Sequence, residues 1–307
     1  MKRIPLILTG LFLSLLSAAI EPIPQSIDYD RQKAALGKKL FFEGRLSKDG
    51  TVACVNCHQL PGSGADVSEF SFGVDGAEGN INSPTVFNAV FNFVQFWDGR
   101  AENLEEQARG PISNPVEMAN SMENVVAMLK SDNDYRHDFS SIYTDGVTPE
   151  NIVDAIAEFE RALITPNARF DRYLRGEKDA LNEQEREGYA FFQGFGCISC
   201  HNGVNIGGNM YQKVGVFLPY EDKTNNLGRY NVTKLEADKF YFKVPSLRNI
   251  ELTAPYMHDG KAKTLEDAVF EMFEHQLGDA YTQAEMDAIV AFLKTLTGEQ
   301  PAILKEP

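Results

Sequence analysis

Two copies of the pattern C-x-x-C-H constrain this chain more than any other feature. They contain all four cysteines, and a histidine directly follows the second cysteine of each copy. The motif residues are Cys54, Cys57 and His58, then Cys197, Cys200 and His201. Two thiols three positions apart on a helical turn can form thioethers at one porphyrin edge, and the next residue can then offer its imidazole to the iron. The motifs therefore predict two covalent c-type haems, with His58 and His201 as axial ligands.

Zinc and disulfide bonds are the alternatives for these cysteines. A structural zinc site gathers four ligands at one place, whereas His58 and His201 lie 143 positions apart. Two disulfides are the default for four cysteines in an exported chain, but disulfides need no histidine after each pair. Because the motif recurs together with its helical surroundings, haem attachment is favoured over both alternatives.

A weak internal repeat surrounds the motifs and predicts a mostly α fold with two related domains. Apolar residues at helical spacing precede each motif, in residues 34–42 and 185–192. A second helix follows each motif at a distance, with DAIAEF at 154–159 matching DAIVAF at 287–292. Thr148-Pro149 predicts the start of the first closing helix, and capping boxes at Asn182 and Thr282 predict two further helix starts.

The repeat divides the chain near residues 165–179. We expect a first cytochrome c-like domain at residues 20–167 and a second at 168–307. Glycine, proline and asparagine concentrate in residues 61–84, 110–120 and 202–231, which predicts loops there. No alternating strand pattern is sustained, although residues 241–244 could form a short ribbon.

The N-terminus and the charge balance indicate an exported chain. Lys2 and Arg3 precede a short apolar stretch that ends at a small-residue site, which predicts a cleaved signal peptide over residues 1–19 and a periplasmic protein. An uncleaved anchor is the alternative, although the stretch is shorter than the about 20 residues that a span needs. The formal charge of −15 argues against nucleic acid and favours a neutral or basic partner, such as a small electron-carrying cytochrome.

The sixth coordination position of each iron decides between electron relay and catalysis. From residue 59 to residue 117 there is no histidine, methionine, lysine, cysteine or tyrosine, so the loops nearest the first motif offer no ordinary capping ligand. His137 lies in a polar run and is expected at the surface. Downstream of the second motif four residues could ligate iron: Met257, His258, Met272 and His275. The residues alone therefore predict one open haem and one closed haem, with the closing ligand undecided.

Several stretches resemble the bacterial dihaem cytochrome c peroxidase family, and the likeness covers nearly all of the chain after residue 19. They include NSPTVFNA at 82–89, QFWDGRAE at 95–102, VEM at 116–118, PSLRN at 245–249, PYMHDG at 255–260 and FLKTLTG at 292–298. The resemblance implies that the chain reduces hydrogen peroxide to water with electrons from a small periplasmic cytochrome or an equivalent donor. It also implies a homodimer.

The resemblance assigns roles to the two haems and their surroundings. The haem held by His58 would be peroxidatic, and the haem held by His201 would receive electrons. Met272 takes the place of the family's distal methionine, with His275 and Met257 as rivals. Trp97 matches the tryptophan that lies between the haems, although the chain's single tryptophan could also be plain core.

Further matches concern acid–base chemistry and calcium. Glu117 matches the family's catalytic carboxylate, with Gln107 nearby. Without the resemblance, Glu117 would be interpreted as a solvated surface acid, because the chain has 44 acidic residues. Proton movement between the two oxygens of peroxide needs such a group. Asn82 and the backbone carbonyls of Thr253 and Pro255 match the ligand positions of a calcium ion between the domains.

One departure from the family concerns activation. Many members carry a loop histidine that caps the peroxidatic iron until the other haem is reduced, and the matching position here is Val74. Valine cannot ligate iron, so we expect the first haem to be open in the oxidised protein, without reductive activation, unless His137 or another distant group caps the iron instead.

Two other functions remain as alternatives. One is a dihaem electron-transfer protein without a substrate. The other is a dihaem enzyme that oxidises a tryptophan of a partner protein into a quinone cofactor. That group uses tyrosine as the distal ligand, so a methionine at position 272 argues against it.

Overall fold

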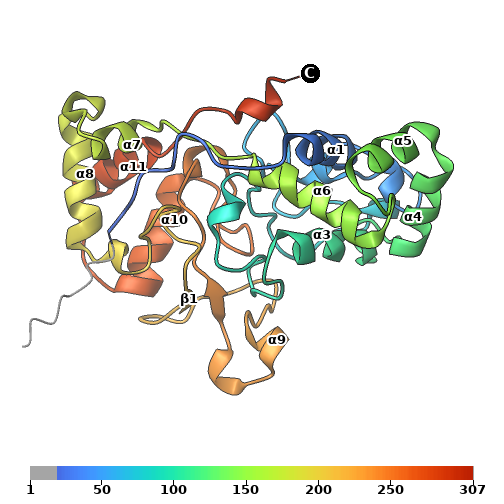
Figure 1. Cartoon of the computed structure of the whole chain (residues 1–307). Coiled ribbons are helices and arrows are strands. Elements are labelled where there is room, and N and C mark those ends of the chain that lie inside the picture. The colour runs from blue at the N-terminus through green and yellow to red at the C-terminus, as the bar shows by residue number, and fades with distance from the viewer. Residues whose placement is uncertain (1–18, 307) are drawn as a thin grey trace, which may run out of the picture.

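Two pairs of crossing helices form the framework of the protein (Figure 1). The computed structural model describes residues 19–306. In the first half α1 (Arg31–Phe41) packs across α6 (Pro149–Arg161), and in the second half α8 (Glu183–Gly194) packs across α11 (Gln283–Lys294). The prediction of a mostly helical fold with two related domains is confirmed.

The same glycine contact brings both helix pairs together. A Cβ built on Gly37 would overlap the Ala155 carbonyl oxygen and lie 2.9 Å from Phe159 Cβ. A Cβ on Gly188 would overlap the Ala288 carbonyl oxygen and lie 2.9 Å from the Cβ of the corresponding phenylalanine, Phe292. Each glycine therefore permits a backbone approach that no larger residue allows.

The predicted helix starts are confirmed. Thr148 caps α6 by accepting a hydrogen bond from the Asn151 amide, with Pro149 at the first helical position. Asn182 and Thr282 form complete capping boxes at the starts of α8 and α11. These bonds satisfy amides that have no partner within the helix.

Shorter elements connect the two pairs. The helices are α2 (Cys54–Cys57), α3 (Leu104–Ser113), α4 (Met122–Ser131), α5 (Asn133–Ile142), α7 (Arg169–Leu174), α9 (Tyr230–Thr233) and α10 (Leu265–Glu271). Helix α10 continues as a π-helical segment over Met272–Leu277. The expected ribbon is present: β1 (Tyr211–Lys213) pairs antiparallel with β2 (Tyr241–Lys243), and Gln212 lies opposite Phe242.

The expectation of a loop over residues 110–120 is partly wrong. Helix α3 includes Gly110 and Pro111 and ends only at Ser113, where Asn114 caps it. Burial of Ile112 in the first core holds this last turn in place. A proline near the end of a helix interrupts one backbone hydrogen bond but does not prevent the turn.

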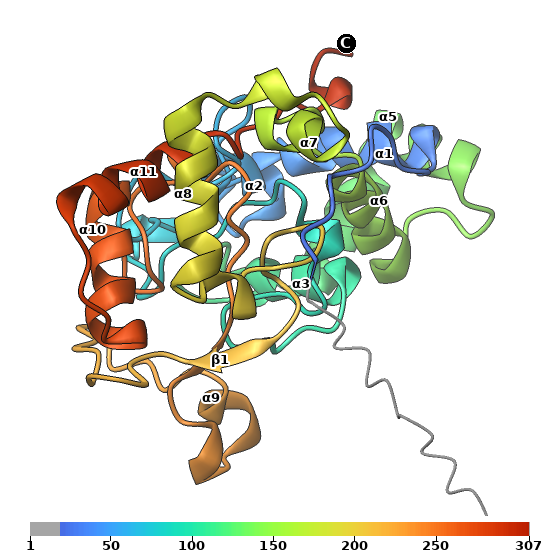
Figure 2. The same cartoon turned by 90° about the vertical axis from the view of Figure 1, so that its left-hand side faces the viewer.

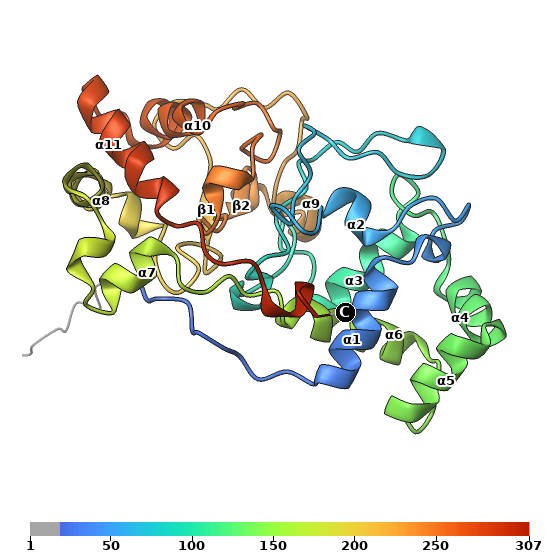
Figure 3. The ribbon, with the colours of Figure 1, turned by 90° about the horizontal axis from the view of Figure 1, so that it is seen from above.

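Each half has its own apolar core, and the chain ends cross between them (Figures 1 and 3). Ile20, near the start of the described chain, packs in the core of the second half and pairs with Gly203. Ile303, near the C-terminus, packs in the core of the first half. Figure 2 shows the early segment running upward to α1. Each half thus holds one end of the other's chain.

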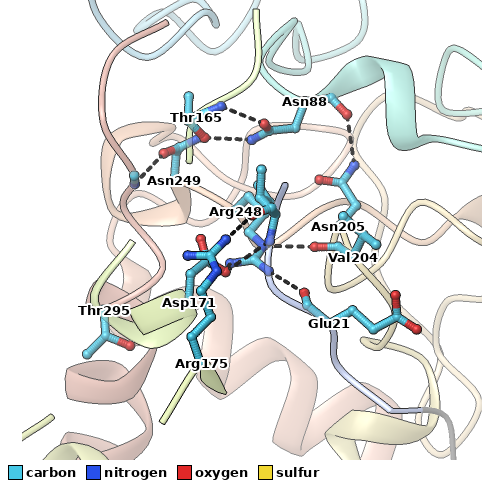
Figure 4. A network of polar contacts seen from close by, with 12 residues as sticks. Glu21, Asn88, Thr165, Asp171, Arg175, Val204, Asn205, Arg248, Asn249 and Thr295 are labelled. Atoms are coloured by element: carbon cyan, nitrogen blue, oxygen red, sulfur yellow. Dashed lines mark hydrogen bonds and ion pairs between the residues drawn. The ribbon is translucent and has the colours of Figure 1, made fainter. Parts of the chain in front are cut away.

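A buried polar network joins the two halves (Figure 4). Asn88 accepts a hydrogen bond from the Thr165 amide at 2.8 Å, and its side-chain amide donates to Thr165 Oγ1 at 2.7 Å. Asn249 donates to the same hydroxyl oxygen, and Asn205 donates to the Asn88 carbonyl. These residues come from both halves and from the segment between them.

The chain's first residues bear on export. The predicted signal peptide lies outside the described residues except for its last position. Within residues 19–306, no helix is both long and apolar enough to traverse a lipid bilayer.

Candidate haem and peroxide site

The second motif opens onto a large apolar cavity. Cys197 and Cys200 begin and follow a 3₁₀ turn, and together with His201 they line a cavity of about 260 Å³. His201 Nδ1 lies 3.2 Å from the Ile206 carbonyl oxygen, which accepts its proton and leaves Nε2 free. Burial lowers the pKa of His201 to about 4, so its imidazole is neutral and can ligate a metal.

The first motif is built in the same way. Cys54 and Cys57 begin and end α2, and His58 follows as its cap. His58 Nδ1 lies 3.2 Å from the Gly64 carbonyl oxygen, and burial lowers the pKa of the imidazole. Phe41 of α1 lies beside His58, and Phe192 of α8 lies beside His201. In both pairs the ring centroids are 6.4 Å apart.

Both sites fit a covalently attached haem. All four thiols are free, so each pair is available for thioether bonds. Each histidine has one nitrogen fixed by a carbonyl and the other unengaged, which is the arrangement of an axial ligand. The walls of the larger cavity are mainly apolar side chains, which exclude water from a bound macrocycle.

The candidate distal ligands of the second cavity differ in their surroundings. Met272 lines the cavity that His201 also lines. Met257 and His258 line it as well, and His258 Nε2 lies 3.3 Å from Asp222 Oδ2. His275 is not among the lining residues: its Nε2 lies 3.2 Å from Glu271 Oε2 and its Nδ1 lies 3.3 Å from the Leu218 carbonyl oxygen. The geometry therefore favours Met272 over His275.

Gln107 and Glu117 line the cavity of the first motif together with His58. Gln107 comes from α3, and Glu117 lies on the loop just after it. Asn114 Nδ2 donates a hydrogen bond to Glu117 Oε1 at 2.6 Å and holds the carboxylate in place. Burial raises the pKa of Glu117, against the opposing effects of Asn114 and of the positive charge of Arg100. A carboxyl group with a raised pKa accepts a proton more readily than a solvated carboxylate does.

Val74 lies against the backbone of Glu117. Its side chain is buried in the first core, and its amide donates a hydrogen bond to the Glu117 carbonyl oxygen at 2.8 Å. A Cβ on the neighbouring Gly73 would overlap the backbone of residues 116 and 117. The loop is thus packed tightly against residues 116 and 117, with a buried apolar side chain at position 74. His137, on α5, is exposed.

Trp97 and the three candidate calcium ligands also line the second cavity. Trp97 Nε1 donates a hydrogen bond to the Asn82 carbonyl oxygen at 2.8 Å, which fixes the indole. Within residues 19–306, Asn82 Oδ1 and the carbonyl oxygens of Thr253 and Pro255 accept no hydrogen bond. Three neutral oxygens without donors suit a hard cation such as calcium, with water completing the coordination.

Sequence reasoning missed one acidic residue of the first cavity. Glu160, on α6, lines the same cavity as His58 and Glu117 and is only 4% exposed. The internal repeat contained the signal, because the equivalent position in the second half is Leu293. The helix pair alone therefore does not require an acidic residue at position 160.

Known proteins resemble this chain along most of its length. A family model of di-haem cytochrome c peroxidases matches residues 31–179, and a cytochrome c model matches residues 185–297. Cytochrome c551 peroxidase of Nitrosomonas europaea is 51% identical over 283 residues, which cover 92% of this chain and 85% of that protein. Cytochrome c peroxidase Ccp of Escherichia coli is 47% identical over 91% of this chain, but this match spans only 61% of that protein's length.

A solved structure extends the likeness to the fold. A MauG-like protein associated with microbial copper homeostasis superimposes with a TM-score of 0.81 at 27% identity, over 96% of this chain and 97% of that one.

Proposed function

Because this chain belongs to the bacterial di-haem cytochrome c peroxidase family, carries two c-type haems and acts as a peroxidase, we propose that it reduces hydrogen peroxide to water at the His58 cavity with electrons received at the His201 cavity. The observation that carries the proposal is the presence of Glu117 and Gln107 in the cavity of the first motif. The residue roles, the donor and the cell compartment below belong to this proposal.

The protein's part in peroxide reduction is proton handling. The reaction consumes two protons and two electrons for each H₂O₂ and releases two water molecules. A haem bound at His58 supplies the redox chemistry and a coordination position for the substrate. Glu117 takes the proton from one peroxide oxygen and delivers it to the other, so that the latter leaves as water. Gln107 orients the peroxide through its side-chain amide.

Electron supply involves the other half. We propose that Met272 would hold the second haem together with His201, which would close that haem to substrates and suit it to electron transfer. Trp97, held by its bond to Asn82, provides a π-system beside the second cavity. The donor is a small periplasmic cytochrome or an equivalent carrier, and the acidic net charge favours a basic partner.

A calcium ion near Trp97 would join the halves. Asn82 belongs to the first half, whereas Thr253 and Pro255 belong to the second, and all three line one cavity. We propose these residues as its ligands. The remaining proposals are a cleaved signal over residues 1–19, a division at residues 167 and 168, a periplasmic location and a homodimer.

We also propose that the first haem needs no reductive activation. Val74 is buried and its loop is packed against residues 116 and 117, which supports a site that is ready for peroxide in the oxidised protein.

The test is steady-state peroxide turnover with a reduced small cytochrome as donor. Replacement of Glu117 by glutamine keeps the shape but removes the proton-transfer group, and should lower kcat by about 10²- to 10⁴-fold. Glu123→Gln, a substitution at the surface of α4, is the matched control and should leave kcat unchanged. Wild-type kcat in Glu117→Gln would contradict the proposed site. Turnover of a partner-protein tryptophan instead of peroxide would favour the quinone-forming alternative.

A further inference from the structure

Glu160 is a buried acid that the proposed reaction does not use. It lies near the end of α6, is 4% exposed, and lines the first cavity together with His58, Gln107 and Glu117. Among the described residues, no side chain or backbone group donates a hydrogen bond to its carboxylate, and no cation pairs with it. A buried carboxylate without a partner is costly as an anion and is stable as a neutral acid.

The internal repeat shows that the acid is not required by the fold. Ile156 and Glu160 lie one helical turn apart on α6, and both line the first cavity. The equivalent residues of α11, Ile289 and Leu293, line the second cavity in the same way. The second half therefore builds this wall from two apolar side chains. Only the half with Gln107 and Glu117 places a carboxyl group there.

Burial and a neighbouring acid keep Glu160 neutral. Burial has the larger effect, and the negative charge of Glu105 on α3 further disfavours an anion at Glu160. Together they raise the pKa of Glu160 to about 8. The neighbouring Arg161 cannot compensate, because it is paired with Glu105 at 2.7 Å and with Glu158 at 2.9 Å. From α1 the cavity wall is Phe41, and the remaining ionisable groups of the wall are Glu117, His58 and the motif thiols, which thioether bonds would remove from titration.

We propose that Glu160 is a second proton-holding group of the peroxide site, which stores one of the two protons that the reaction consumes. This inference rests on the proposed function, because it assumes that peroxide is reduced in the first cavity. Glu117 moves a proton that peroxide itself brings. Glu160, protonated before turnover, transfers its proton to the second peroxide oxygen as that oxygen is reduced to water, and becomes a carboxylate. It is then reprotonated from solvent on the side of the partly exposed Glu105–Arg161 pair.

The direct test is infrared spectroscopy of the haem-loaded protein without peroxide. Wild type should show a protonated carboxyl band at neutral pH that disappears as the pH rises past about 8, and Glu160→Gln should lack it. A second readout is the midpoint potential of the first haem, which should fall with rising pH in this range in wild type and lose that dependence in the variant. Glu150→Gln, at the exposed start of α6, is the matched control for both measurements.

The outcomes separate this inference from the proposed function. A wild-type protein without the band, or a Glu160→Gln variant that keeps both the band and the pH-dependent potential, would overturn the role of Glu160. Glu117→Gln would still lose turnover in that case, so the peroxide site would stand. If Glu160→Gln does not retain haem, Glu160→Leu, which restores the residue of the second half, replaces it. In turnover at neutral pH, either variant should lose about tenfold in kcat, less than Glu117→Gln.

Discussion

Replacing Arg248 by methionine should destabilise the protein strongly, because it leaves a buried charge without its partner. The side chains of Arg248 and Asp171 are 1% and 0% exposed, and Arg248 Nη1 lies 2.6 Å from Asp171 Oδ1. Arg248 also donates to the carbonyl oxygens of Val204 at 2.9 Å and Glu21 at 2.8 Å (Figure 4). It therefore ties the early segment of the chain to the second half.

The magnitude follows from what remains after the substitution. In the wild type, Asp171 Oδ1 accepts only one further bond, from the Ile23 amide at 3.2 Å, and Oδ2 has no partner among the described residues. Removing one member of such a pair costs about 3 to 5 kcal/mol. Replacing both members, in Arg248→Met with Asp171→Leu, should cost clearly less than the sum of the single losses, because no unpaired charge then remains.

Urea unfolding followed by circular dichroism and Soret absorption measures this difference. With a slope of about 3 kcal/mol per molar urea, Arg248→Met should lower the midpoint of the second half by about 1 to 2 M. The control is Arg31→Met, which breaks an exposed pair with Glu306 and should cost less than about 1 kcal/mol. A loss below about 1 kcal/mol for Arg248→Met, or single losses that simply add, would refute the reasoning.

Three further predictions concern packing, pH and ligation. Gly37→Ala and Gly188→Ala should each lower the free energy of unfolding by about 1 to 3 kcal/mol, because the methyl group forces the crossing helices apart. Thermal unfolding measures this loss. An unchanged melting temperature would contradict the close helix contact. Glu160 has a folded pKa of about 8 and an unfolded value of 4.5, so between these two pH values the folded state keeps a proton that the unfolded state has lost. The free energy of unfolding should therefore fall as the pH rises through this window, by up to about 1.4 kcal/mol per pH unit relative to Glu160→Leu. A constant difference between the two proteins would contradict this prediction. Met272→Ala should convert the second haem to a high-spin form in visible spectra, whereas His275→Ala should not, and the reverse would reassign the distal ligand.

The sequence predicted the fold well because its strongest signals are local. Thr148-Pro149 and the boxes at Asn182 and Thr282 are short patterns whose physics is complete within four residues, and all three helix starts are present. The repeat around the two haem motifs indicated two similar helix pairs, because each copy carries its own local helix signals. The glycines at the crossings were not recognised, since their role depends on a backbone a hundred or more residues away.

The candidate site was only partly readable from the sequence. Gln107 and Glu117 were identified by family resemblance, and the structure adds that they share a cavity with His58. Pro111 was read as a turn, although burial of the following residue keeps it helical. The crossing of the chain ends left no local pattern, because Ile20 and Ile303 are ordinary apolar residues whose partners lie in the other half. Glu160 would have been visible only by aligning the two halves residue by residue.

The most direct test of the account is the spin state of the two haems in the oxidised protein as isolated, measured by electron paramagnetic resonance and visible absorption. The account predicts one high-spin haem, vacant beside Glu117, and one low-spin haem held by His201 and Met272. Two low-spin haems would mean that a protein group fills the peroxide position, and the proposed role of the first cavity would then be wrong.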